Sequence, residues 1–363
     1  MKAWRFHAFG DMRLDDVPAP ALKPGHVLVQ PLCVQPSVTE AQLAFGIPTL
    51  AYDRVKRRLE SDAPLQLFGH EFCVRIVETA PDVTRYKVGD RVAARAKLPC
   101  GECTLCRTER TALCRKGPVI GFDLPGCFSE LALLPENALV KVDDAISDSE
   151  AACLQSLSDS VAAVETAGLQ IGDTVVILGQ GSMGLECLQV ARLSGAGLLI
   201  TVDVRDESCR ISKELGADHA LNARTGNVVE AIRDLTGGNG ADVVFECAGG
   251  SPKQGLAGNA TVMQAIDAVR SGGKIIGVSW FGAPLEMNID LLRERSLRYL
   301  FPDISTQGHL EHTVRLVASG RVRLQPTITH KLDGIESVPK AFEITANKGK
   351  FAAINPAQVV LAK

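Results

Sequence analysis

The segment 173–184, DTVVILGQGSMG, constrains the fold of this chain more than any other. Its apolar run 175–178 is too short for a helix and rich in β-branched residues, which predicts a strand buried on both faces. Glycines follow at the spacing G-x-G-x-x-G, and an apolar-periodic run after them predicts a helix. A strand, a glycine turn and a helix direct backbone N–H groups and a helix N-terminus toward a pyrophosphate.

An acidic residue supports a dinucleotide site. The run 198–202 predicts a second strand, and Asp203 follows it, nineteen residues after Gly184. A carboxylate there binds both ribose hydroxyls of NAD and repels the 2′-phosphate of NADP. Arg205 is the single feature that points toward NADP. The alternative interpretation is a structural βαβ unit that binds no dinucleotide.

Composition excludes several classes of protein. A chain of 363 residues exceeds one comfortable core, so we expect two domains. With 46% hydrophobic and 22% charged residues the balance is that of an ordinary globular protein. The net charge of −3 gives no reason to expect nucleic acid or an acidic membrane as a partner. No segment reads as a signal peptide or a membrane span, and we expect a cytoplasmic protein.

The order of predicted elements indicates a discontinuous architecture. Residues 1 to about 150 read as short strands, and from about 160 to 300 strands alternate with helices. Such alternation predicts a parallel sheet with helices on both faces, a doubly wound α/β fold. The last 60 residues return to mixed character, so we expect the domain 159–301 to be inserted into a domain made of 1–158 and 302–363. Further expected elements are helices at 208–215, 227–235, 261–269 and 309–318, and strands at 241–245, 274–278 and 358–361.

Four of the eleven cysteines stand at the spacing C-x2-C-x2-C-x7-C: Cys100, Cys103, Cys106 and Cys114. Four thiolates within fifteen residues can close a tetrahedral site with no open position, which is typical of structural zinc. An iron–sulfur cluster is the alternative, but the last cysteine lacks the following proline of the bacterial ferredoxin pattern. We expect one zinc ion that stabilises a lobe at 98–116. The other seven cysteines read as small buried hydrophobes.

These motifs together resemble the zinc-type alcohol dehydrogenases of the medium-chain dehydrogenase/reductase superfamily, nearly from end to end. The resemblance covers the following segments: Gly69-His70-Glu71, 87–92, the four-cysteine lobe, 179–184, Asp203, 213–217, 272–274 and 347–350. It implies a Rossmann domain inserted in a GroES-like, β-rich catalytic domain. It also implies a second, catalytic zinc, held by a Cys, by the His of the Gly-His-Glu motif and by a third Cys, Glu or Asp. That zinc polarises the oxygen of the substrate.

Two of those three ligand positions are altered in this chain. The positions fall on Ser37, His70 and Gln155. A neutral hydroxyl and a neutral amide are poor ligands for Zn²⁺, which prefers thiolate, imidazole and carboxylate. We therefore expect a weak or absent catalytic zinc, with His70 as the remnant of the site.

Other groups must then carry the acid–base chemistry. Thr39 matches the family hydroxyl that relays the substrate proton, and His70 can exchange protons near neutral pH. Glu40, Glu71 and Asp159 are candidates to orient His70 or to receive a proton. The alternative is that His70 is a hydrogen-bonded core histidine and Glu71 a structural acid.

The resemblance also assigns the contacts to the cofactor. It places the pyrophosphate along the glycine turn, the adenosine ribose on the acid after the second strand, and the nicotinamide at the end of a central strand. The residues concerned are Gly179, Gln180, Gly181, Ser182, Met183, Gly184, Asp203, Arg205, Val278, Ser279 and Lys350.

The segment before His70 is about a dozen residues longer than the resemblance leads us to expect. It contains the basic run 52–60, which predicts a short helix. Its Arg54, Lys56, Arg57 and Arg58 either bind an anionic substrate tail or form a solvated basic face.

The sequence thus predicts an NAD-dependent oxidoreductase that moves hydride between nicotinamide and a secondary alcohol/ketone pair, with or without an anionic group. One alternative is a reductase of conjugated C=C bonds, of enone or enoyl type. An alternative of another class is a catalytically inactive NAD(H)-binding sensor. We expect a small-molecule substrate and, as in the family, a homodimer or homotetramer.

Overall fold

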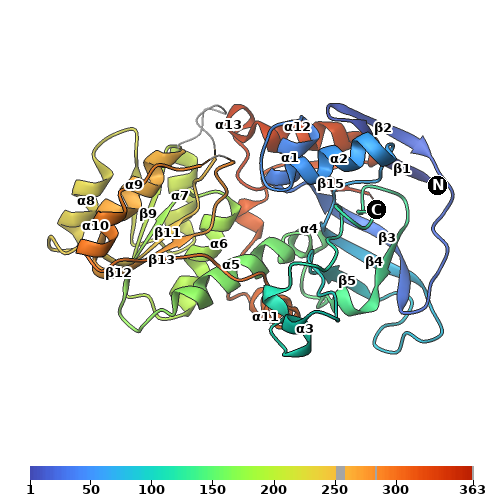
Figure 1. Cartoon of the computed structure of the whole chain (residues 1–363), viewed down its shortest axis with the longest axis horizontal. Coiled ribbons are helices and arrows are strands. Elements are labelled where there is room, and N and C mark those ends of the chain that lie inside the picture. The colour runs from blue at the N-terminus through green and yellow to red at the C-terminus, as the bar shows by residue number, and fades with distance from the viewer. Residues whose placement is uncertain (251–257, 283, 362–363) are drawn as a thin grey trace. The chain divides into compact units, whose positions relative to one another are not determined.

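The computed structural model of the chain describes residues 1–250, 258–282 and 284–361 (Figure 1). The chain divides into two compact units. Unit 1 comprises Met1–Ser158, Ile304–Gly320 and Ile328–Lys363, and unit 2 comprises Asp159–Asp303 and Arg321–Thr327. The short segment Arg321–Thr327 differs from the expected division. It joins unit 2 because Arg323 bonds to the side chain of Gln189 and to the carbonyl of Glu214.

Unit 2 contains six parallel strands in the order β10-β9-β8-β11-β12-β13. This is the strand order of a Rossmann fold, in which a dinucleotide binds where the order reverses, between β8 and β11. The strands are β8 (Thr174–Leu178), β9 (Leu198–Asp203), β10 (His219–Asn222), β11 (Ala241–Glu246), β12 (Val269–Gly277) and β13 (Arg298–Leu300).

Helices cover both faces of this sheet. Figure 1 shows α8 and α9 on one side of the strands and α6 and α7 on the other. The first face buries Val176, Leu178 and Ile200 against α8 and α9. The predicted doubly wound arrangement is thereby confirmed. The helices are α5 (Leu154–Ala167), α6 (Ser182–Leu193), α7 (Asp206–Glu214), α8 (Val228–Leu235), α9 (Asn259–Ala268) and α10 (Ile289–Glu294).

Unit 1 is built on a seven-stranded sheet with the path β14-β15-β3-β4-β5-β7, and β6 also pairs with β3. A hairpin of β1 and β2 stands apart from it. The strands are β1 (Lys2–Ala8), β2 (Asp11–Asp16), β3 (His26–Gln35), β4 (Glu71–Thr79), β5 (Arg91–Ala94), β6 (Ala132–Pro135), β7 (Leu139–Lys141), β14 (Lys331–Asp333) and β15 (Gln358–Val360).

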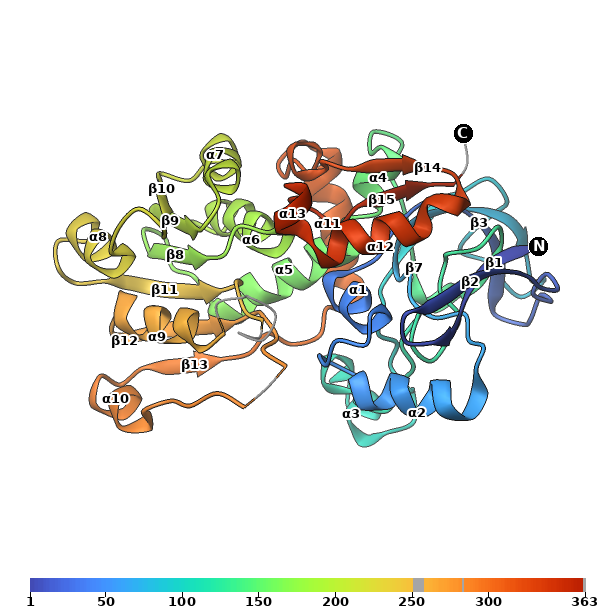
Figure 2. The same ribbon diagram turned by 90° about the horizontal axis from the view of Figure 1, so that it is seen from above.

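The helices of unit 1 are mostly short. Helix α1 packs against α12, as Figure 2 also shows, and α2 packs against β1. They are α1 (Val38–Ala44), α2 (Tyr52–Asp62), α3 (Thr104–Arg107), α4 (Asp148–Ala151), α11 (Gln307–Ala318), α12 (Val338–Ala346) and α13 (Lys348–Phe351). Single 3₁₀ turns lie at Thr111–Leu113, Glu136–Ala138, Gln325–Thr327 and Ile335–Ser337. No helix in the described part of the chain combines the length and the apolar character needed to cross a bilayer.

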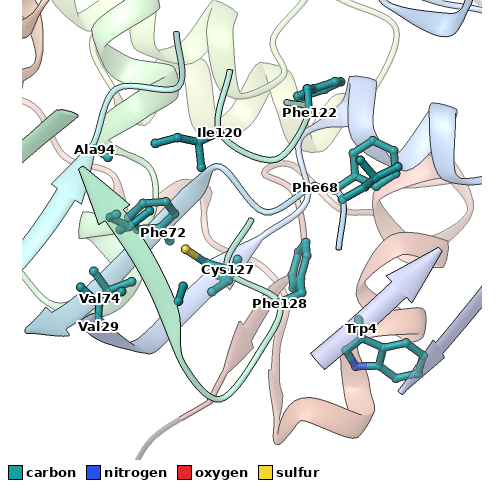
Figure 3. Close-up of a cluster of buried hydrophobic side chains, with 14 of the residues drawn as sticks. Trp4, Val29, Phe68, Phe72, Val74, Ala94, Ile120, Phe122, Cys127 and Phe128 are labelled. Atoms are coloured by element: carbon teal, nitrogen blue, oxygen red, sulfur yellow. The ribbon is translucent and has the colours of Figure 1, made fainter. Parts of the chain in front are cut away.

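An aromatic cluster forms the core of unit 1 (Figure 3). Phe68 is fully buried and makes an edge-to-face contact with Phe6, at 4.8 Å between ring centroids. Phe122 packs against Phe68 at 5.6 Å and lies 5.9 Å from the ring of His70. The core therefore holds the chain rigidly immediately before and beside His70.

Candidate active site, cofactor site and zinc site

Glu40 and His70 form a close pair in unit 1. His70 Nδ1 lies 2.5 Å from Glu40 Oε1, and the Glu40 side chain is fully buried while that of His70 is 12% exposed. Glu40 is in the first turn of α1, where its Oε2 accepts the backbone N–H of Ser37 and the Ser37 hydroxyl accepts the N–H of Glu40. This reciprocal capping box fixes the carboxylate. His70 is therefore held by a rigid acceptor.

The pair also fixes the tautomer of the imidazole. A carboxylate only accepts hydrogen bonds, so the proton of neutral His70 lies on Nδ1. Nε2 is then the nitrogen that exchanges protons, and it lies 3.9 Å from Glu71 Oε1. A histidine oriented in this way by a buried carboxylate is the arrangement that general acid–base catalysis uses.

Glu71 is itself fixed by a chain of buried amides. Its Oε2 accepts a hydrogen bond from Gln35 Nε2 at 2.5 Å. The Gln35 carbonyl oxygen in turn accepts from Asn355 Nδ2 and Gln358 Nε2, both at 2.9 Å, and from the Cys153 thiol. These donors fix the orientation of the Gln35 amide, so that its N–H must point at Glu71.

Three buried polar residues of this chain of contacts were not among the predicted site residues: Gln35, Asn355 and Gln358. All three are polar residues that are at most 1% exposed. Gln35 is a polar residue at the end of strand β3, directly after the apolar residues 32–34, and this was the signal available in the sequence. Cys153 lies in the same cluster, and its thiol hydrogen-bonds to the Gln35 carbonyl oxygen and to the Ser149 carbonyl.

The residues at the catalytic-zinc positions do not fit a tightly bound Zn²⁺. The Ser37 hydroxyl is engaged as the N-cap of α1, and Gln155, on α5, offers a neutral amide that is 6% exposed. His70 is the one residue of the three with a side chain that zinc prefers.

Two further predicted site residues lie on the same helices. Thr39 follows Val38 at the start of α1 and is partly exposed; its hydroxyl makes no hydrogen bond to another residue in the described ranges. Asp159 lies on α5, one turn after Gln155, and belongs to unit 2. The orienting role predicted for Asp159 stays a prediction, whereas Glu40 and Glu71 are next to the His70 ring nitrogens.

The four predicted metal cysteines converge in space. Their sulfur atoms all lie within 4.8 Å of one another, with 3.9 Å for Cys100–Cys106 and 3.9 Å for Cys103–Cys114. Four sulfurs at about 2.3 Å from a tetrahedral zinc ion stand about 3.8 Å apart. Within the described residues this is the single cluster of three or more His, Cys, Asp or Glu side chains that can hold a metal ion.

Backbone hydrogen bonds lower the pKa of two of these thiols, which favours the binding of a cation. The N–H of Cys100 points at the Cys114 sulfur from 3.4 Å and lowers the pKa of that thiol to about 6. Backbone hydrogen bonding near Cys106 likewise lowers the pKa of Cys103, whereas burial raises the pKa of Cys106 to about 12. Thiolates at Cys103 and Cys114 suit a structural zinc ion, which these four residues would hold.

The glycine turn after β8 has the geometry of a phosphate cradle. A Cβ on Gly184 would lie 1.8 Å from the carbonyl oxygen of Gly179, and Gly179 has φ +89°. Neither position therefore accepts another residue without a shift of the backbone. The N–H groups of residues 181–184 at the start of α6 have no partner among the described residues, and Gly181 provides no side-chain cap. Unpaired amides at the start of a long helix fit a pyrophosphate.

Asp203 connects this turn to the end of β9. Its carboxylate accepts the backbone N–H of Gln180 at 2.7 Å and that of Arg205 at 2.9 Å, and Arg205 Nε lies 3.5 Å away. The backbone N–H of Gln180 is thus already engaged within the turn. Its buried side-chain amide donates to the carbonyls of Ile177 and Gly179 and accepts a hydrogen bond from the Ser212 hydroxyl. The pyrophosphate contact predicted for the Gln180 backbone amide stays a prediction, since in this arrangement that N–H is bonded to Asp203.

The remaining cofactor predictions fall into two groups. The backbone N–H groups of Val278 and Ser279 bond to the Glu246 carbonyl, and the Ser279 hydroxyl donates to the buried Glu246 carboxylate. This ties the ends of β11 and β12 together at the edge of the sheet where a Rossmann fold binds its ligand.

Lys350 lies on α13 in unit 1, with its Nζ 5.4 Å from the Phe351 ring centroid. Its contact to the cofactor stays a prediction.

The basic segment is a helix as expected, α2, but its cations are engaged within unit 1. Arg54 pairs with Asp123, and Arg58 donates to the carbonyl of Phe122. Arg57 donates to the carbonyl of Asp53, and Lys56 lies 3.9 Å from Glu60. These contacts favour a structural basic face over the binding of an anionic substrate.

Comparison with known proteins agrees with both domains. Residues 24–144 match the alcohol dehydrogenase GroES-like domain, and residues 182–317 match the zinc-binding dehydrogenase family. L-Threonine 3-dehydrogenase of Pyrococcus horikoshii is 32% identical over 333 residues, which span 91% of this chain and 90% of that protein.

Two solved structures share the fold. A protein of Sinorhizobium meliloti 1021 assigned as a zinc-binding dehydrogenase and bound to NADP is 27% identical, with a TM-score of 0.84 over 100% of this chain and 99% of that one. Alcohol dehydrogenase TADH from Thermus sp. ATN1 is 25% identical, with a TM-score of 0.83 over 100% of both chains. The chain is an oxidoreductase that belongs to the zinc-type alcohol dehydrogenase family of the medium-chain dehydrogenase/reductase superfamily.

Proposed function

We propose that the protein is an NAD-dependent dehydrogenase of a secondary alcohol/ketone pair in which the Glu40–His70 pair performs the acid–base step. The observation that carries this proposal is the 2.5 Å contact of His70 Nδ1 with the buried Glu40 carboxylate. It leaves Nε2 as the basic atom, at a position where members of the family place a zinc ligand.

Bound NAD supplies the hydride acceptor at its nicotinamide ring. The residues of this chain handle the proton that leaves at the same time. When the alcohol is oxidised, its carbon loses hydride, and its O–H proton passes through the Thr39 hydroxyl to His70 Nε2. The imidazolium that forms is stabilised by Glu40, and in the reverse direction it returns the proton to the developing alkoxide.

The substrate class follows from what this site lacks. A metal ion stabilises developing charge on oxygen by several kcal/mol, and an imidazolium alone supplies less. A ketone next to an electron-withdrawing group needs less help, so we expect a substrate that is activated in this way. L-Threonine, a secondary alcohol with an ammonium and a carboxylate group, is the substrate in the name of the relative that is 32% identical, and it is the first compound to test.

A zinc count combined with a substrate screen tests the proposal. We expect about one zinc per chain, on the four-cysteine lobe, and turnover that survives brief exposure to a chelator at a dose that leaves that zinc in place. The screen follows NADH absorbance with hydroxy amino acids, hydroxy acids, diols and enones. Two zinc ions per chain, with activity lost when one is removed, would contradict the proposal. Turnover of enones alone would instead assign a C=C reductase, and NADH binding without any turnover a sensor.

The choice of cofactor depends on Asp203. Replacing Asp203 by Asn keeps one acceptor for the Gln180 amide but removes the charge that repels a 2′-phosphate. We expect the Kd of NADH to rise about tenfold, a cost of about 1.4 kcal/mol, while that of NADPH falls or stays constant. Fluorescence titration with both cofactors measures this. Asp206→Asn, in the first turn of α7, is the matched control. An unchanged NADH affinity in Asp203→Asn would show that the ribose contact lies elsewhere.

A further inference from the structure

One row of polar side chains crosses the sheet of unit 1 beside His70. Gln35 on β3 is paired with Glu71 on β4. The pairing of β4 with β5 matches Val74 to Val92 and Arg75 to Arg91. Continued past the end of β5, this register places Arg95 level with Glu71.

The face of the sheet on which this row lies follows from its neighbours. Residues one step away in each strand, Val34, Phe72 and Ala94, belong to the apolar core of unit 1, part of which Figure 3 shows. Successive side chains of a strand point to opposite faces. Gln35, Glu71 and Arg95 therefore project together from the face opposite to that core.

Arg95 differs from the other two members of the row because its charge has no partner in the part of the chain that the structure describes. The residue is 9% exposed, and its Nε atom is buried without a hydrogen-bond partner. Its guanidinium makes no hydrogen bond or ion pair with any residue in the ranges 1–250, 258–282 and 284–361. Burial lowers the pKa of this guanidinium. An arginine nevertheless stays protonated in a protein, so the positive charge remains.

A buried, uncompensated cation destabilises a folded chain. The backbone around Arg95 is well fixed: its N–H donates to the Ala138 carbonyl, and the next carbonyl, that of Ala96, accepts from Ile120. The fold thus holds a pre-organised donor group at a position where it makes no hydrogen bond or ion pair with the described residues. This is the pattern of a ligand-binding residue.

We propose that Arg95 binds an oxyanion, a carboxylate or a phosphate group, of the ligand that occupies the site beside His70. The planar guanidinium matches both groups in a two-point hydrogen bond. Arg95 thus takes the anion-binding role that was one of the two interpretations of the basic run in α2, whose arginines are engaged elsewhere. The idea that this oxyanion belongs to a ligand reacting at His70 rests on the proposed function, but the presence of an anion site at Arg95 does not.

Binding of simple anions tests the site without any assumption about turnover. The full-length protein is titrated with sodium acetate and with inorganic phosphate at constant ionic strength, and the melting temperature and the heat of binding are followed. We expect saturable binding to the wild type and a loss of affinity of at least tenfold in Arg95→Met. Arg95→Lys keeps the charge but cannot form the two-point hydrogen bond of a guanidinium, so it should bind with intermediate affinity.

A second titration separates the two sources of the anion. If Arg95→Met weakens NADH at least tenfold, the bound group is a phosphate of the dinucleotide. If NADH affinity is unchanged and acetate or phosphate binding to the NADH complex is lost, the group belongs to the substrate. Either result supports an oxyanion site at Arg95.

The control is Arg75→Met, which removes an exposed arginine from the neighbouring strand β4 and should bind all probes as the wild type does. The proposal is overturned if Arg95→Met binds acetate, phosphate and NADH with wild-type affinity. It is also overturned if Arg75→Met loses as much anion affinity as Arg95→Met, because the binding would then be an adventitious surface effect. Should Arg95→Met fail to fold, Arg95→Lys with wild-type affinity for all three probes overturns it equally.

Discussion

Replacing Glu40 by Gln should lower kcat by a factor of about 10³–10⁴ and leave the fold intact, since Gln also serves at this position of a capping box. Both oxygens of Glu40 accept a hydrogen bond, one from Ser37 N–H and one from His70 Nδ1. A Gln side chain has one acceptor oxygen, so its amide group turns toward His70 and favours the tautomer protonated on Nε2. That tautomer cannot accept the substrate proton. Steady-state kinetics across pH 5–10 measures the loss.

The same experiment separates a catalytic pair from a structural one. His70→Asn should lose about as much activity as the double variant Glu40→Gln/His70→Asn, because two residues that act as one unit give non-additive effects. Glu78→Gln, on β4, is the control and should keep full activity. Zinc content must stay constant throughout the series. A Glu40→Gln enzyme with wild-type kcat and pH profile would show that His70 is a core histidine.

Replacing Cys106 by Ser should remove the bound zinc ion and destabilise the protein by about 4–5 kcal/mol. The lobe around the four cysteines contains one turn of α-helix, α3, and a single 3₁₀ turn. It has little apolar surface of its own, so the metal is what holds it. Zinc analysis, together with urea unfolding of the wild type and the variant, measures both effects.

Two controls show whether the effect belongs to the lobe. Cys209→Ser, on α7 of unit 2, should keep the zinc and the unfolding midpoint, since this thiol hydrogen-bonds to the Leu221 carbonyl and does not belong to the four-cysteine cluster. NADH affinity of any folded Cys106→Ser protein should be unchanged, because the cofactor turn lies in unit 2. A Cys106→Ser protein with full zinc content and wild-type stability would refute a four-thiolate structural site.

Features that reside in a short, contiguous stretch could be predicted well. The strand, glycine turn and helix at β8 and α6 follow from local periodicity and from the steric demand at Gly184. The four cysteines also lie within fifteen residues, so their spacing alone restricts the geometry. In both cases neighbours in the chain are neighbours in space.

Features that depend on contacts between distant strands could not be predicted. The sequence left two roles open for the four cations of α2, an anion site or a solvated basic face, and could not show that Asp123 and the Phe122 carbonyl, more than sixty residues away, engage Arg54 and Arg58. Arg95 was not among the site residues predicted from the sequence. Its importance arises because strand register places it beside Glu71 and because it has no counter-ion within the described residues.

The sequence by itself determined the family, the alternation of strands and helices, the dinucleotide turn and the thiol cluster, because each depends on the spacing of residues that are close together in the chain. The tertiary structure alone decided which partner each buried polar group has. It brought Glu40 to His70 across thirty residues and Gln358 to Gln35 across 323, and it left Arg95 without a partner among the residues that the structure describes. The chemical role of a charged group depends on its neighbours, and these neighbours are fixed by strand register and by packing of the core.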